Sequence, residues 1–76
     1  MLPIQVDKEA PTGTVDGTNT VFTVLTVPNP SSSMYLFRNG LLQKEGFDYN
    51  ISGATITFLA VSTPQPGDTL LASYKH

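Results

Sequence analysis

Cysteine and tryptophan are missing from this 76-residue chain, and its only histidine is the last residue, His76. Without cysteine, these residues cannot form disulfide bonds, thiolate zinc sites or iron–sulfur clusters, and they hold no cysteine nucleophile. A single terminal histidine argues against a histidine-clustered metal site and against a Ser-His-Asp triad. We therefore predict no catalytic residues, no metal site and no cofactor.

Charge is also scarce, because charged residues make up 13% of the chain and the net charge is −2. Nucleic-acid binding takes a basic stripe, whereas the four basic residues are scattered along the chain: Lys8, Arg38, Lys44 and Lys75. No apolar run exceeds the length of 58–61, while a membrane-spanning helix needs about twenty residues. We expect neither nucleic acid nor a membrane as a partner. The N-terminus also lacks the basic start and apolar run of a signal peptide.

Apolar residues recur with a period close to two, which is typical of β-strands. In 20–27 nearly every residue is β-branched or aromatic, and both faces are semi-apolar, which predicts a strand covered on both sides. The runs 47–51, 54–59 and 69–75 alternate as well. Ile56 and Phe58 are predicted to point inward, and Leu70, Ala72 and Tyr74 are predicted to share one face of the last strand.

Three residue pairs mark the structural turns: Asn39-Gly40, Ser52-Gly53 and Gly67-Asp68. The first pair lies between the strand-like runs 34–38 and 41–44. An Asn-Gly pair accommodates the positive φ angles of a type I′ turn, whose twist matches the flanking strands. This segment is therefore predicted to be a β-hairpin.

We predict a single all-β domain over residues 1–76, with no substantial helix. Five to seven short antiparallel strands would form a small β-sandwich or barrel. Residues 1–13 are expected to be an extended arm or edge strand, with the strand itself at 4–8, and residues 14–75 the core module. Within the module, 13–17 is expected to lead as a strand into an Asp-Gly turn.

Acidic residues lie in or beside the predicted turns, and we interpret them as turn formers because Asp bonds its own backbone. They are Asp16, Glu45, Asp48 and Asp68. The segment 48–53 also matches the first half of a calcium loop, but the twelfth position, which should be a bidentate glutamate, is Leu59. We therefore predict no calcium site, and the chain is not expected to be an enzyme.

The segment before the Asn-Gly turn is apolar on both faces, which in so small a domain implies a second covering layer. Another subunit would supply that layer. The candidate interface residues are Met34 and Leu36 on one face and Tyr35 and Phe37 on the other.

The order of these features resembles small β modules of bacteriophage tail fibres, tailspikes and related virion appendages. Residues 16–24 are similar to the "DGxNxxF-x-V" opening of these modules, and residues 35–42 are similar to their "vyvNGvxl" hairpin. Further along the chain, residues 46–53 match the pattern "G-x-DY-x-v-x-G" and residues 55–58 match "xitF". Near the end, residues 66–70 match "p-x-GD-x-i", and Tyr74 matches the terminal "xY". Arg38 departs from the pattern, because a small or β-branched residue is commoner there.

The resemblance implies a structural or host-attachment module of a virion, made in the host cytoplasm and usually homotrimeric. Its partners would be further copies and other virion proteins. The shared positions are turn formers and core residues, so no catalytic residue transfers. The alternative is a carbohydrate-binding adhesion module, which would recognise a bacterial surface glycan through exposed Tyr or Phe and either the loop 31–33 or the loop 64–68.

Overall fold

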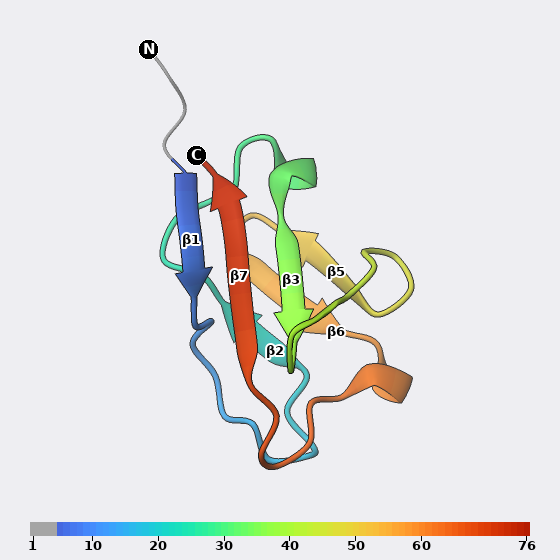
Figure 1. Cartoon of the computed structure of the whole chain (residues 1–76). Coiled ribbons are helices and arrows are strands. Elements are labelled where there is room, and N and C mark those ends of the chain that lie inside the picture. The colour runs from blue at the N-terminus through green and yellow to red at the C-terminus, as the bar shows by residue number, and fades with distance from the viewer. Residues whose placement is uncertain (1–4) are drawn as a thin grey trace.

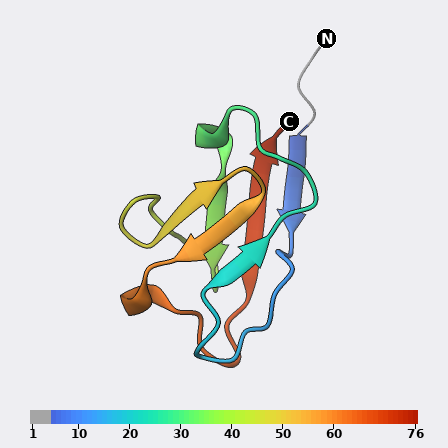
Figure 2. The same cartoon turned by 180° about the vertical axis from the view of Figure 1, so that it is seen from behind.

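The computed structural model describes residues 5–76, which fold into two antiparallel β-sheets stacked as a sandwich (Figure 1). Sheet A has the strand order β1-β7-β3-β4, and sheet B has the order β2-β6-β5. Figure 2 shows sheet B from its outer side. The strands are β1 (Gln5–Glu9), β2 (Val21–Thr23), β3 (Tyr35–Arg38), β4 (Leu41–Leu42), β5 (Tyr49–Ser52), β6 (Thr55–Phe58) and β7 (Leu70–Lys75). Two 3-10 turns are η1 (Ser31–Ser33) and η2 (Ala60–Ser62).

This architecture confirms the predicted all-β fold with five to seven short antiparallel strands. The expected edge strand at 4–8 corresponds to β1, which pairs with β7 in the structure, whereas Ile4 lies outside the described residues. Residues 1–3 of the expected N-terminal arm also lie outside them.

The core lies between the inner faces of the two sheets, where alternate side chains of each strand meet. Phe22 packs its ring edge-on against Phe58, with the ring centroids 5.7 Å apart. The inward orientation predicted for two side chains of β6, Ile56 and Phe58, is confirmed. The three side chains of β7 predicted to share one face are all buried, which shows that this face is the inner one. The buried hydrophobic residues are Phe22, Val24, Met34, Leu36, Tyr49, Ile56, Phe58, Leu70, Ala72 and Tyr74.

The predicted hairpin is formed by β3 and β4, in which Phe37 lies opposite Leu42 and Arg38 opposite Leu41. Asn39 and Gly40 both have positive φ angles, 53° and 81°, as a type I′ turn requires. The second turn is displaced by one residue, because Ser52 still pairs with Thr55. The two-residue loop is therefore Gly53-Ala54 rather than Ser52-Gly53.

The strand predicted over 20–27 is shorter than expected and is covered on one side only. β2 ends at Thr23, and Leu25 and Val27 are exposed. Within the described chain, no second layer covers the outer face of sheet B. Of the residues 20–27, only the two that point inward, Phe22 and Val24, are therefore buried. A high content of β-branched residues indicates that a segment favours a strand, but it does not indicate that both faces of the strand are buried.

The strand predicted over 13–17 is not formed, whereas the Asp-Gly turn into which it was expected to lead is present and is organised by Asp16. Its Oδ1 accepts hydrogen bonds from the backbone N–H groups of Asn19 and Thr18, at 2.8 and 2.9 Å. These hydrogen bonds, with Asn19 first, lower the pKa of the Asp16 carboxyl below its ordinary value. Asp16 therefore fits the interpretation of the acidic residues as turn formers.

Candidate interaction surface

Strand β3 and the residue before it, Met34, divide the four predicted interface residues between the two faces of sheet A. Met34 and Leu36 are buried in the chain's own core, Leu36 to 0% exposure. They cannot contact another subunit, and their place in the predicted interface was wrong, because sheet B supplies the layer that covers them. Tyr35 points outward and is 57% exposed, and Phe37 lies on the same outer face.

Strand pairing builds an apolar patch around these two outward aromatic residues. Phe37 lies directly opposite Leu42 of β4 on one side and Leu71 of β7 on the other, and Tyr35 lies opposite Ser73. Directly opposed side chains of antiparallel strands share a face and touch. We call Tyr35, Phe37, Leu42 and Leu71 the outer apolar patch.

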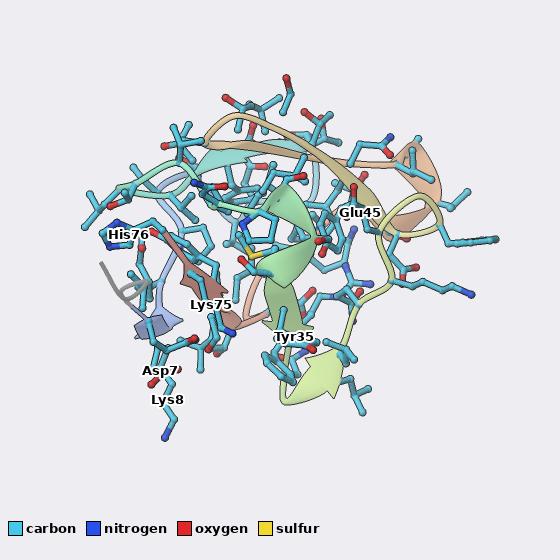
Figure 3. The ribbon with its side chains drawn as sticks, turned by 90° about the horizontal axis from the view of Figure 1, so that it is seen from above. Asp7, Lys8, Tyr35, Glu45, Lys75 and His76 are labelled. Atoms are coloured by element: carbon cyan, nitrogen blue, oxygen red, sulfur yellow. The ribbon has the colours of Figure 1, made fainter. Side chains whose placement is uncertain are left out.

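The character of sheet A changes from apolar near β4 to charged near β1. On β1, Asp7 and Lys8 are exposed, and Gln5 pairs with Lys75 of β7. Figure 3 shows Tyr35 standing away from the core on the same side of the molecule as Asp7 and Lys8. The uncharged part of this face is therefore confined to β3, β4 and the neighbouring part of β7.

Large apolar side chains continue past the patch at the β4 edge. Leu41 is 71% exposed, and Phe47, in the loop that follows β4, is 65% exposed. The Lys44 ammonium lies over the Phe47 ring, 4.3 Å from its centroid. This edge therefore exposes apolar side chains on both sides of sheet A, with Leu42 on the outer face and Leu41 on the other.

The outer face of sheet B has a different chemistry. Register places its outward residues in two rows across the three strands. The rows are Val21–Thr57–Asn50 and Thr23–Thr55–Ser52. Hydroxyl and amide groups dominate these six positions, and none of the six side chains is charged, as expected of a solvated face in a chain with little charge.

Arg38 joins three segments at one end of the sandwich. Its Nη1 donates a 2.6 Å hydrogen bond to the Ser62 carbonyl, and its Nε lies 3.9 Å from the Asp68 carboxylate. Asp68 also accepts from the Gln65 N–H and the Asn39 side-chain amide. The Gln65 hydrogen bond and then that of Asn39 lower the pKa of Asp68. These contacts hold the Asn39-Gly40 turn against the loop that contains Asp68. The Asp68 carboxylate therefore has a structural role.

Tyr74 and Glu9 form a second polar contact, which anchors the chain beyond β2. The Tyr74 hydroxyl donates to Glu9 Oε1 at 2.5 Å, and Glu9 Oε2 accepts from the Leu25 N–H at 2.8 Å. Burial, and next the hydrogen bond with Glu9, raises the pKa of the Tyr74 hydroxyl. The contact joins β1, β7 and the segment around Leu25, so it serves the fold.

The two loops predicted to contact a glycan are not brought together. η1, formed by Ser31–Ser33, and the loop 64–68 lie at opposite ends of the sandwich (Figures 1 and 2). Ser33 Oγ is engaged by the Lys75 N–H at 3.0 Å. The two loops therefore belong to separate surfaces of the sandwich.

Within residues 5–76, no three His, Cys, Asp or Glu residues are grouped so that they could hold a metal ion. No helix in that range is long and apolar enough to cross a membrane. Neither a family model, nor a curated protein, nor a solved structure matches this chain. The surface chemistry is therefore the basis for a functional proposal.

Proposed function

We propose that this chain is a structural module of a bacteriophage virion appendage, such as a tail fibre or tailspike, acting through contacts between protein subunits. The observation that supports this proposal is the outer apolar patch, whose four side chains adjoin on the outer face of sheet A. Burying apolar surface stabilises an assembly by about 25 cal/mol per Å². Burial of the outer apolar patch would therefore favour association of neighbouring subunits.

The patch suits rigid assembly because its side chains are carried by paired strands. Phe37 is held between Leu42 and Leu71, so little ordering is needed when a partner binds. All four side chains are uncharged, and the net charge of the chain is only −2, so copies can approach with little repulsion. We propose a homo-oligomer within the virion, for which the resemblance implies three copies, with other virion proteins as further partners.

The carbohydrate-binding alternative has less support from the same surface. Phe22, Tyr49 and Phe58 are committed to the core, and one face of the exposed Phe47 ring is occupied by Lys44. The exposed Tyr35 belongs to the apolar patch rather than to a polar groove. Glycan binding by a stable monomer would favour the alternative.

The proposal is tested by substituting Tyr35 with aspartate and measuring the molar mass in solution. We expect the molar mass of the wild-type protein to be a multiple of 8.2 kDa, and that of the Tyr35→Asp variant to approach 8.2 kDa. A buried carboxylate without a partner opposes association, while the exposed position leaves the monomer fold intact. Light scattering coupled to size exclusion gives the mass, and far-UV circular dichroism checks the fold.

The matched control is Thr57→Asp, which adds the same charge to the outer face of sheet B. We expect its mass to equal that of wild type, because Thr57 lies on the face without the apolar patch. Wild type that stays at 8.2 kDa across a wide concentration range would contradict the proposal.

A further inference from the structure

We infer that β4 is the edge at which a second copy of this chain adds its own β4, which extends sheet A across a two-fold axis. This inference rests on the proposed assembly function and specifies the partner and the contact. A two-fold contact joins copies in pairs, so it predicts a dimer where the resemblance implies a trimer. The two are therefore separable by experiment.

The two edges of sheet A differ in their protection against strand addition. On β1, Asp7 and Lys8 are exposed, and the pairing is irregular between Val6 and Glu9. Lys8 also has a positive φ of 56°. Charges and bulges on an edge strand oppose pairing with another chain. The β1 edge is therefore closed to a second copy.

The β4 edge is short, with two residues, but it carries neither charges nor a bulge. Both of its residues, Leu41 and Leu42, are apolar and exposed. The Gln43 N–H donates to the Leu36 carbonyl of β3 at 2.7 Å. Since backbone groups of successive strand residues point to opposite sides, Leu42 directs its own N–H and C=O away from β3. β4 therefore offers one donor and one acceptor to a further strand.

The edges of sheet B are less suited to a second copy. Thr12 already bridges β2, because its N–H donates to the Thr23 carbonyl at 2.7 Å and its carbonyl accepts from the Thr23 N–H at 2.9 Å. At the other edge, β5 exposes the polar side chains of Asn50 and Ser52. Among the edges of the described sheets, β4 is therefore the apolar one.

Two β4 strands are complementary to each other when they run antiparallel about a two-fold axis through Leu42. The N–H and C=O of Leu42 then exchange hydrogen bonds with the same residue of the second copy. Leu41 lies opposite Gln43 in this register. The two outer apolar patches become neighbours on one face of the extended sheet, so the main-chain contact and the apolar contact reinforce each other.

Charge does not oppose this register. Lys44 of the second copy lies opposite Gly40, beside Asn39, whose side chain binds the Asp68 carboxylate at 2.9 Å. That carboxylate is already paired with Arg38 of its own chain, so the contact does not depend on a new ion pair. No like charges are placed opposite each other along the paired strands.

The area required is within reach of this edge. A stable interface takes about 800 Å² from each partner, about one sixth of the chain's accessible surface of 4651 Å². One fully buried aromatic side chain accounts for about 150–250 Å². Leu41, Leu42, Phe47 and Tyr35 are each more than half exposed, and together they supply a large part of this area.

The test is Leu42→Pro, which deletes the one backbone donor that faces away from β3. Proline is tolerated on an edge strand where its missing N–H would face solvent, so the monomer should still fold. We expect the mass to fall from about twice 8.2 kDa in wild type to 8.2 kDa in the variant. Leu42→Val is the matched control, because it keeps the N–H and an apolar side chain, and it should remain dimeric.

Other outcomes overturn the inference in distinguishable ways. A wild-type mass of three times 8.2 kDa, unchanged by Leu42→Pro, overturns the β4 contact and leaves the proposed function standing. A monomeric wild type overturns both. A dimer that survives Leu42→Pro but dissociates on Tyr35→Asp shows a contact through the sheet face, which also overturns the inference.

Hydrogen exchange of wild type tests the same contact without a substitution. The Leu42 amide should exchange slowly at high protein concentration and quickly after dilution, because only the second copy bonds it. The Gln43 amide should stay protected in both states, since it bonds Leu36 within the chain. Fast exchange of Leu42 in the assembled protein would overturn the inference, including in the case that Leu42→Pro does not fold.

Discussion

At the scale of single residues, Gly13 is required by close packing. A Cβ at this position would lie 2.3 Å from Cδ2 of the Phe22 ring, which is itself buried in the core. Gly13→Ala must therefore displace Phe22 or the backbone. We expect a loss of about 1–3 kcal/mol in the free energy of unfolding, as for other overpacked sites, measured by urea denaturation.

The effect should depend on the Phe22 ring. In a Phe22→Leu background the same Gly13→Ala change should destabilise less, because the ring edge that the Cβ meets is gone. The two substitutions then show coupling in a double-mutant cycle. An equal loss in both backgrounds would show that the effect comes from backbone conformation instead.

At the scale of elements, the β3–β4 hairpin depends on the backbone and the side chain of Asn39. Its amide donates to Asp68, and its Oδ1 accepts from the Thr69 N–H, both at 2.9 Å. Asn39→Gly keeps the positive φ but loses these bonds, and should cost about 1–2 kcal/mol. Asn39→Ala should cost about 1 kcal/mol more, because alanine disfavours positive φ.

Thermal or urea unfolding of both variants measures these two contributions separately. If Asn39→Gly is as stable as wild type, the hydrogen bonds to the 68–69 loop contribute nothing. If the two variants are equally unstable, the turn conformation contributes nothing.

The elements also show where local sequence is sufficient and where it is not. The hairpin was predictable because the Asn-Gly pair specifies its own turn, and the register then follows. Leu42 and Leu71 were not predicted to belong to the candidate interface. Leu42 could have been included, because the hairpin alone places it opposite Phe37. Leu71 could not be found in this way, because the pairing of β3 with β7 joins segments far apart in the chain.

At the scale of the whole molecule, burial of tyrosine couples stability to alkaline pH. Burial raises the pKa of Tyr49 from 10.0 to about 12, and Glu45 and Asp48 add to the shift. The folded protein keeps this proton where the unfolded chain loses it, so the contribution is complete below pH 10 and is lost as pH rises toward 12. We expect the urea midpoint to fall over this range.

Tyr49→Phe is the variant that checks the assignment, because it removes the ionisable group and keeps the ring. Its urea midpoint should depend less steeply on pH between 10 and 12 than that of wild type. Tyr74, whose pKa is also raised by burial, should account for part of the remaining slope. Identical slopes in wild type and variant would contradict the assignment to Tyr49.

Alternation and turn chemistry act locally, so the amino-acid sequence was sufficient to predict the fold class, the inward side chains of β6 and the position of the hairpin turn. Which apolar faces are covered depends instead on how the two sheets pack. Met34 and Leu36 are buried because sheet B packs over them, while Tyr35 and Phe37 on the same strand remain on the outside. Both faces of this strand are apolar in sequence, so only the arrangement of the second sheet could distinguish core from contact surface.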